Sequence, residues 1–393
     1  MSEGHAITGA AAANCLGIDN ATVFERAFAG AEAFSPSAAY HEFPFTTQLG
    51  LLPAFTPGPD EVLACTPTRL ANVALASVRQ LRPAVRASVA RWGARRIAYV
   101  FASSTGGLEE TERAMAPRGT APRTEVRYAD HGIDATSLAI MRFLGIEGLQ
   151  MAVSTACSSS FKALASASRL IDHGLADAVV VGGADSLCRT TVFGFHSLGL
   201  TAPTATQPFS RDRNGITLGE GSAYVLIERA GEATRRGALA WVAGQGAASD
   251  AFHHTSPLPE GLGGQLCMRQ ALERAALSAN EIDYVSAHGT GTKLNDAAEA
   301  IAVTRVFERN IPLTATKSLT GHTLGSAGLT SLVLAIESLR RQEIPATLRA
   351  VPVDDSLGVA VVAERTPANL RHVLVNAFGF GGSNASVVIS RRG

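Results

Sequence analysis

The sequence has few of the cysteines that crosslink small secreted proteins. It contains five cysteines among 393 residues, an odd number at wide spacing. They are Cys15, Cys65, Cys157, Cys188 and Cys267. A disulfide framework needs an even set of cysteines at close spacing in a short chain. We therefore expect free thiols and a reducing compartment, the cytoplasm.

The chain also lacks an excess of either charge and any long hydrophobic run. Lys plus Arg and Asp plus Glu both number 34. The first residues, MSEGHAITGAAAANCLG, place no basic segment before an apolar run. No uncharged apolar stretch reaches the roughly 18 residues of a membrane span. We therefore expect no nucleic-acid partner and no stable membrane insertion.

Hydrophobic residues, in contrast, make up 46% of the sequence, so a large core can form in two domains or in two halves of one unit. Short β-branched runs alternate with helical patterns, which is typical of layered α/β proteins. The predicted strands lie within residues 95–107, 149–157, 177–185, 282–292 and 311–322, and two further β runs flank a glycine loop within 372–390. Helices are predicted from residue 161 to a glycine cap at residue 174, and over 265–277 and 329–339.

A charged segment with a helical pattern, residues 228–240, separates two stretches that repeat this order of elements. We expect two packed halves, 1–236 and 237–393, rather than two domains joined by a flexible linker. The strands of each half end in polar, glycine-rich loops, which would meet at one site.

The loop STACSSS, residues 154–160, places Cys157 where a strand leads into a helix. The unpaired N–H groups and positive dipole end at a helix N-terminus lower the pKa of a thiol, so this position suits a nucleophile. Cysteine is also among the most buried residue types, and a lone cysteine is more often part of a core.

Three residues in the strand-end loops of the second half favour the interpretation of Cys157 as a nucleophile. His288 lies in AHGTGT, and His322 follows Lys317 by five residues in KSLTGH. Histidines in Gly/Ser/Thr loops are more often functional than histidines on an apolar face. A thiol, two imidazoles and an amine together suit covalent catalysis.

The remaining candidates have simpler interpretations. Cys15, Cys65, Cys188 and Cys267 have no histidine in a nearby loop, so we expect core positions. His253 and His254 lack a third ligand at metal-site spacing, and no metal is expected. The segment FGFGG near residue 380 is not followed by a helix, which excludes a dinucleotide-binding turn.

Four segments, in this order, carry a resemblance to a known family. STACSSS, AHGTGTKLND, TKSLTGHTLGSAG and NAFGFGGSNAS resemble the signature loops of the β-ketoacyl-acyl carrier protein synthases of the thiolase superfamily, most closely the elongating type II ketosynthases. The segments GGLEE (106–110) and PFSRDRNGITLGEGSAYVLIE (208–228) are also similar to the family. The resemblance implies a thiolase-like fold, in which two similar halves form αβαβα layers.

It also implies a Cys-His-His site for decarboxylative condensation. Cys157 would take the acyl group from an acyl carrier protein, and its own N–H and that of Phe380 would bind the oxyanion. His288 and His322 would hydrogen-bond the malonyl thioester, and Lys317 would tune the charge around His322. No cofactor is implied beyond the phosphopantetheine arm of the carrier. The TGH sequence favours elongation, because initiating relatives carry asparagine there and thiolases use a second cysteine.

The resemblance assigns supporting roles to further residues. Phe378 and Phe380 would form the gate of the acyl pocket. Thr105, Thr290 and Thr292 would contact substrate, and Asp296 and Glu299 match acidic residues of the family. Three positions differ from it: Ser331 replaces a glutamate near Lys317, Gln207 replaces an arginine, and Thr105 replaces a bulky aliphatic residue.

These differences, with the short first half, suggest a specialised polyketide-type or aryl-polyene-type ketosynthase. A catalytically silent partner, the chain-length factor of a heterodimer, is the alternative, but such partners usually lack the cysteine. The expected partners are an acidic carrier protein, for which Arg211 and Arg213 are docking candidates, and a second subunit, either an identical chain or a ketosynthase-like paralogue.

Overall fold

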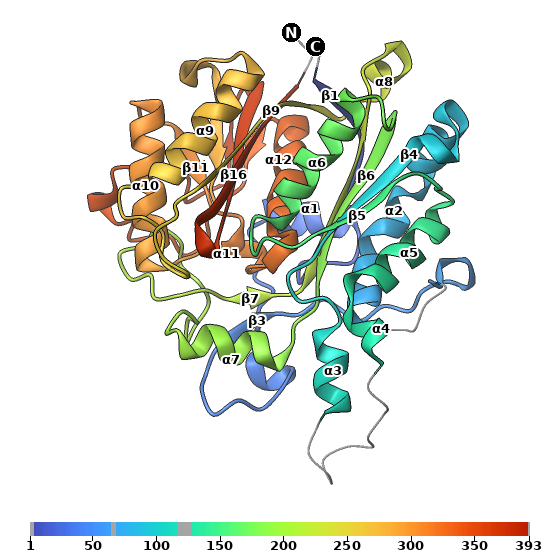
Figure 1. The fold of residues 1–393 in the computed structure, drawn as a ribbon. Helices are drawn as coiled ribbons and strands as arrows, with labels where there is room; N and C mark the ends of the chain where they lie inside the picture. The colour runs from blue at the N-terminus through green and yellow to red at the C-terminus, as the bar shows by residue number, and fades with distance from the viewer. Residues whose placement is uncertain (1–3, 64–67, 116–126, 392–393) are drawn as a thin grey trace.

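A sheet of eleven strands runs through both halves of the chain in the computed structural model, which describes residues 4–63, 68–115 and 127–391 (Figure 1). In spatial order its strands are β13 (Ala360–Val361), β11 (Pro312–Thr314), β10 (Tyr284–Ser286), β15 (His372–Gly379), β16 (Ser383–Ser390), β9 (Ala240–Ser249), β1 (His5–Ala13), β8 (Gly221–Glu228), β6 (Ala178–Asp185), β4 (Ile97–Ala102) and β5 (Gln150–Val153). Short strands β2 (Ser35–Pro36), β3 (Gln48–Gly50) and β7 (Leu218–Gly219) form a second sheet, and β12 (Glu343–Ile344) pairs with β14 (Thr366–Pro367).

Each half of the chain supplies one continuous block of the large sheet. The blocks meet where His5–Ile7 of β1 pairs antiparallel with residues 240–242 of β9. Between them in sequence lies α8 (Glu232–Gly237), in the charged segment predicted to be helical. The boundary that we propose at residues 236 and 237 falls at the end of this helix.

Three hydrophobic clusters divide the elements into layers. The central cluster joins α6 (Ser159–Asp172) and α12 (Ala327–Arg341) to the facing sides of both sheet blocks. A second cluster packs α2 (Arg69–Trp92) and α5 (Ile133–Leu144) on the outer face of the first block. A third packs α9 (Leu262–Ala275) and α10 (Lys293–Phe307) on the outer face of the second block. These are the predicted αβαβα layers.

The remaining helices lie around these layers. They are α1 (Asn20–Phe28), α3 (Leu108–Ala114), α4 (Tyr128–His131), α7 (Arg189–Ser197) and α11 (Lys317–Thr320), with the 3-10 turns η5 (Leu324–Ser326) and η7 (Phe380–Gly382) among the short ones. In the part of the chain that the structure describes, no helix is both long and apolar enough to cross a membrane.

The predicted strands and helices all correspond to observed elements, whereas others, including β1, β8, β9, α5 and α10, were not predicted. Two of the unpredicted features depart from what the local sequence indicates. Helix α2 spans 24 residues and contains Pro83 in its interior, where proline ordinarily interrupts a helix. Residues 317–320, predicted as part of a loop, form the single turn α11. Cys15, Cys188 and Cys267 are buried free thiols, as predicted, and Cys65 lies outside the described residues.

Candidate active site

Cys157 lies in the tight turn that joins β5 to α6. Ala156 has φ = 52°, a left-handed conformation that turns the chain just before the cysteine. Ser159 accepts a hydrogen bond from the Thr155 backbone N–H (2.8 Å) and donates to the Ala156 carbonyl (2.5 Å). Ser158 donates to the Thr155 carbonyl (2.9 Å). The serines thus hold the turn that presents the thiol, as the sequence led us to expect.

The environment of the Cys157 sulfur differs from the expectation in one respect. Burial raises the pKa of the thiol to about 11, because a thiolate loses its hydration there. The Lys317 charge and the backbone N–H groups of Phe380 and Cys157 oppose this rise but do not cancel it. The backbone N–H groups at the turn thus lower the pKa, as expected, but desolvation outweighs them and the net shift is upward.

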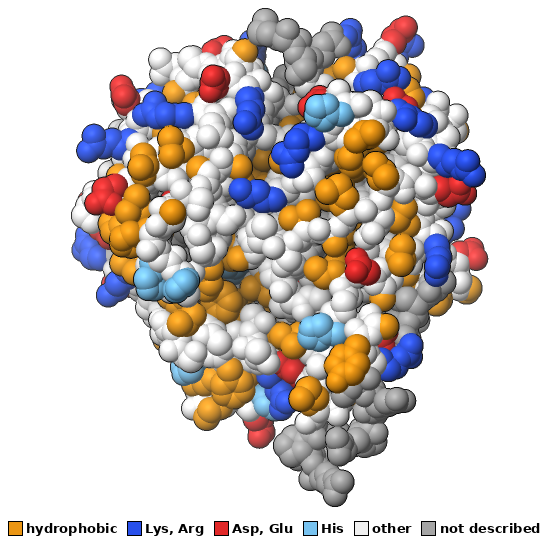
Figure 2. All heavy atoms as spheres, in the orientation of Figure 1, with side chains coloured by type: hydrophobic (Ala, Val, Ile, Leu, Met, Phe, Trp, Pro, Cys, Tyr) orange, Lys and Arg blue, Asp and Glu red, His pale blue; other side chains and the backbone are white. Residues whose placement is uncertain are grey.

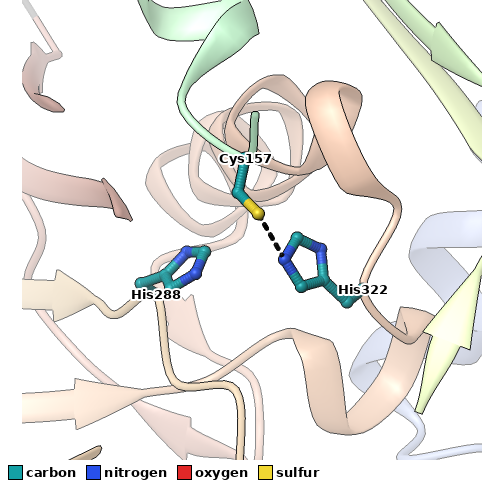
Figure 3. Close-up of side chains that lie close together, drawn as sticks. All are labelled: Cys157, His288 and His322. Carbon is teal, nitrogen blue, oxygen red and sulfur yellow. Dashed lines mark hydrogen bonds between the residues drawn. The ribbon is translucent and has the colours of Figure 1, made fainter. Parts of the chain in front are cut away.

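Two imidazoles from the second half face this thiol (Figure 3). His288 follows β10, and His322 follows α11. His322 Nε2 lies 3.0 Å from Cys157 Sγ, and the two imidazole rings stand edge to face with centroids 5.4 Å apart. Both histidines are almost fully buried. The structure thus brings the three predicted residues together.

Hydrogen bonds at Nδ1 determine which nitrogen of each imidazole carries the proton. The Leu324 backbone N–H donates to His322 Nδ1 (3.1 Å), and Lys317 Nζ lies 3.2 Å from His288 Nδ1. Burial and the Lys317 charge hold the pKa of both histidines well below its usual range, so both are neutral. A neutral imidazole that accepts at Nδ1 carries its proton at Nε2. Both rings therefore present Nε2–H donors.

This protonation state bears on metal binding. The ligand atoms of Cys157, His288 and His322 lie within 4.8 Å of one another, close enough for one ion. A metal-binding imidazole offers a lone pair and usually donates its other N–H to an acceptor. Here Nδ1 of each ring is itself the acceptor, so the arrangement suits an oxyanion better than a cation.

Lys317 contacts His288 rather than His322. Its ammonium donates to the His288 carbonyl (2.5 Å) and lies beside His288 Nδ1, while its charge lowers the pKa of both histidines. Burial lowers the pKa of Lys317 to about 8, against the opposing effect of the Glu299 carboxylate. Lys317 was expected to tune the charge around His322, and its charge does lower the pKa of that histidine. Its direct contact with His288 was not predicted.

The acidic residues Asp296 and Glu299 shape the loop that carries His288. Glu299 accepts from the backbone N–H groups of His288 and Gly289, both at 2.7 Å. Asp296 accepts from the N–H groups of Thr290 (3.0 Å) and Gly291 (3.1 Å). Both side chains are buried and come from the first turns of α10. They support the loop rather than reach the thiol.

Ser331, where relatives were expected to carry glutamate, pairs with the Thr316 hydroxyl at 2.9 Å. It therefore supplies no charge for Lys317. The carboxylates that stabilise the charged lysine are those of Glu299 and Asp296.

A cavity of about 490 Å³ opens onto the thiol. It is lined by the two histidines and by Thr290, Thr292, Phe378 and Phe380, together with an apolar wall from α7 and the following segment. Figure 2 shows hydrophobic side chains gathered over α7 and over α9 and α10 on this side of the molecule. Thr105 is not among the lining residues, since its hydroxyl bonds Asp185 (2.9 Å).

Phe380 lies at the cavity wall in the loop between β15 and β16. Gly381 and Gly382, with φ of 73° and 72°, turn the chain directly after it. Its ring stacks on Phe195 of α7, with centroids 5.3 Å apart. The Gly381 N–H donates to the His254 carbonyl (2.7 Å), so the 250–258 loop supports this turn. Phe195 and that support were not predicted, because only tertiary packing brings these segments together.

The two arginines expected to dock the carrier protein, Arg211 and Arg213, differ in exposure. Arg211 is exposed, 3.7 Å from Asp355. Arg213 is buried and pairs with Asp354 at 2.6 Å. The expectation that Arg213 lies free on a docking surface is therefore wrong.

These features define a thiol acyltransferase in a layered α/β fold, and comparison with known proteins specifies the family. The β-ketoacyl synthase N-terminal domain matches residues 75–233, and the β-ketoacyl synthase C-terminal domain matches residues 239–350. The chain belongs to the β-ketoacyl synthase family, as its signature loops predicted.

Individual relatives agree with this assignment. The chain is similar to 3-oxoacyl-[acyl-carrier-protein] synthase 2 of Vibrio cholerae, with 34% identity over 76% of each chain. It is 36% identical to nodulation protein E of Rhizobium meliloti, over 71% of this chain and 72% of that one. It also resembles a chain of the complex of a ketosynthase with its chain length factor from Xenorhabdus doucetiae, with 34% identity, a TM-score of 0.88, and coverage of 99% of this chain and 98% of that one.

Proposed function

We propose that this protein joins an acyl group held on Cys157 to a malonyl thioester with loss of carbon dioxide, which lengthens the chain by two carbons. The observation that carries the proposal is the convergence of one thiol and two Nε2–H donors in one buried cavity. The family membership and the synthase names of the relatives support the same reaction.

In the first step the Cys157 sulfur attacks the carbonyl carbon of an acyl thioester. The tetrahedral oxyanion accepts from the backbone N–H groups of Cys157 and Phe380, which already contact the sulfur. The carrier thiol then leaves with the proton that the cysteine gave up, and the acyl group remains on Sγ. Nucleophilic catalysis thus divides one difficult transfer into two easier ones.

In the second step the malonyl thioester carbonyl accepts from the Nε2–H groups of His288 and His322. Breaking of the bond to the carboxylate releases carbon dioxide and leaves an enolate, whose charge the two donors stabilise. The enolate carbon attacks the acyl carbonyl, and collapse of the adduct expels the Cys157 thiolate. Donors preorganised in a buried site contribute about 3–4 kcal/mol each to such a step.

An acyl carrier protein is the proposed bearer of both substrates. The names of the curated relatives, acyl-carrier-protein synthases, support it. Thr290 and Thr292, whose hydroxyls lie 3.0 Å apart on the cavity wall, are the proposed contacts of the phosphopantetheine arm. Arg211 remains the candidate for carrier docking. The reaction requires no other cofactor, and we place the protein in the cytoplasm, where its buried free thiols stay reduced.

A second subunit is proposed at the edge strand β5. This strand ends the sheet, and Met151 and Ala152 are exposed there although β5 lies beside the buried strand β4. An exposed edge with apolar residues invites pairing with another strand. The partner is an identical chain or a ketosynthase-like paralogue, and the Xenorhabdus doucetiae complex offers a precedent for the second arrangement.

Within such an assembly we propose the catalytic role, not the silent one. The intact Cys157, His288 and His322 support this choice, since a chain-length factor needs none of them. A pathway to polyketides or aryl polyenes is the proposed context, suggested by Thr105, by Ser331 in place of the expected glutamate, and by the short first half of the chain. A clear preference for long saturated acyl carriers over polyunsaturated ones would contradict this pathway.

Mass spectrometry tests the proposed function directly. Incubation with an acyl-loaded carrier protein is expected to add one acyl group to Cys157, and malonyl carrier protein should then release a β-ketoacyl product. The variant C157A should form no adduct. A wild-type protein that stays unacylated, alone and with its genomic neighbours, would support the silent partner instead.

A further inference from the structure

Asp185 is a fully buried carboxylate at the end of β6, outside the residues described above as catalytic. Among the ion pairs of residues 4–63, 68–115 and 127–391, none includes Asp185. Hydrogen-bond donors from two distant segments surround it instead. Such a carboxylate is costly to bury unless its oxygens are well bonded.

The first segment is the loop after β4. Asp185 Oδ1 accepts from the Ser103 hydroxyl (2.8 Å) and from the backbone N–H groups of Ser104 (2.7 Å) and Thr105 (2.8 Å). The Thr105 hydroxyl donates to the same oxygen (2.9 Å). Ser104 in turn donates to the Ala156 carbonyl (3.3 Å), directly before Cys157. One carboxylate oxygen therefore connects β6 to the turn of the nucleophile.

The second segment is the η5 turn, from the other half of the chain. Asp185 Oδ2 accepts from the Gly325 backbone N–H at 2.7 Å. The residue before Gly325 is Leu324, whose N–H donates to His322 Nδ1. A side chain at Gly325 would come within 2.9 Å of Asp185 Oδ2 and 2.8 Å of Ser104 Oγ. The absence of a side chain there thus permits this close approach.

We propose that Asp185 is a positioning residue of the condensation, which fixes the His322 loop relative to the Cys157 turn. It acts through Gly325 and Leu324 on one side and through Ser104 and Ala156 on the other. This inference rests on the proposed function, since it concerns the geometry of that reaction.

Its role is geometric and not an activation of the thiol. The negative charge of Asp185 raises the pKa of Cys157 and so disfavours the thiolate. Loss of this charge would, by itself, make Cys157 easier to ionise. A variant without the charge should therefore form the acyl-enzyme at least as readily, unless its turn is displaced. The hydrogen bond from the Gly325 N–H instead helps to position His322, whose Nε2–H stabilises the enolate.

The variant D185N distinguishes the contacts with the 103–105 loop from the contact with Gly325. The amide oxygen of asparagine can still accept from the 103–105 loop, whereas its NH₂ group would face the Gly325 N–H and cannot accept from it. We expect the release of carbon dioxide from malonyl carrier protein to fall about 10- to 100-fold, as for a misplaced catalytic group. Acylation of Cys157, followed by mass spectrometry, should stay near the wild-type rate.

G325A and S103A complete the test. A methyl group at residue 325 would crowd both Asp185 Oδ2 and Ser104 Oγ, so G325A should displace the η5 turn and lower decarboxylation more than acylation. This variant decides the question if D185N does not fold. S103A, the matched control, removes one donor from Oδ1 of the same buried carboxylate and should leave the ratio unchanged. The ratio distinguishes positioning from general destabilisation, which would reduce both half-reactions by one factor.

Equal losses in both half-reactions, or an unchanged ratio in D185N and G325A, would overturn the role of Asp185 while the proposed function stands. A wild-type protein that performs neither half-reaction would overturn the proposed function itself.

Discussion

The ring of Phe195 on α7 stacks on the ring of Phe380 at 5.3 Å, with an interplanar angle of 23°. This contact connects the apolar wall of the cavity to the loop whose backbone N–H contacts the Cys157 sulfur. The glycines that follow Phe380 have left-handed backbone conformations, and the stack is a side-chain contact that restrains the turn they form.

Loss of this stack should allow malonyl carrier protein to react before Cys157 has been acylated. An aromatic pair contributes about 0.5–1.5 kcal/mol beyond its buried area. We therefore expect F195A to raise the decarboxylation of malonyl carrier protein in the absence of an acyl donor by about 2- to 10-fold. F380A should perturb the order of substrate entry in the same direction. Carbon dioxide release before and after preacylation measures the effect.

F193A is the matched control, because Phe193 lies on the same helix and packs on Phe43 and Phe45 instead. It should keep the wild-type order of addition. If F195A and F380A also keep it, Phe380 does not act as a gate.

The histidines should affect the second half-reaction more than the first. In H288A and H322A one Nε2–H donor to the enolate is lost, so decarboxylation should fall about 10²- to 10³-fold, as on removal of one oxyanion donor. H322Q retains an amide N–H at similar reach and should lose less. The acyl adduct on Cys157, measured by mass spectrometry, should still form. Loss of the adduct in H288A would instead make that ring part of the acylation machinery.

Much of the fold follows from local patterns, and the layers illustrate why. Val179–Val181 predicts a buried strand, and Val179 and Val181 lie in the central core. The face that contains Leu329, Leu332 and Ile336 predicts a buried helix, which belongs to the same core. Helix α2 was missed because Pro83 in its interior is a local signal against it. The apolar face of α2 that packs on the sheet stabilises the helix in spite of Pro83, which lies on its exposed side.

Some residues of the site could likewise be predicted from local sequence, and others could not. The loops that hold Cys157, His288 and His322 carry recognisable residues at strand ends, and Glu299 matches the family pattern. Asp185 and Phe195 have no such signal, because their partners are remote in sequence. The Asp185 contact with Gly325 spans 140 positions. The burial of Arg213 could not be predicted for the same reason, because its ion-pair partner Asp354 is remote in sequence.

The pH profile should report the charge of Lys317. Its pKa of about 8 means that the ammonium is charged below pH 8 and loses its proton above it. The charge favours the Cys157 thiolate and holds the His288 proton at Nε2. Decarboxylation should therefore decline as the pH rises through about 8. In K317M the activity should be low and this decline absent.

K317R retains the charge at high pH and serves as the control: its activity at pH 9 should not fall relative to that at pH 7. A wild-type profile that instead declines as the pH falls through 6.5 would assign the titration to a histidine.

The edge strand β5 gives a prediction about assembly. Met151 is 39% exposed on a strand whose outer edge has no partner among the described residues. A charge at this position opposes strand pairing and the burial of apolar surface at an interface. M151D should therefore shift the protein toward the monomer by native mass spectrometry, either alone or coexpressed with a paralogous neighbour. V351D, at another exposed apolar residue, should not change the assembly. A dimer that persists in M151D would place the interface elsewhere on the surface.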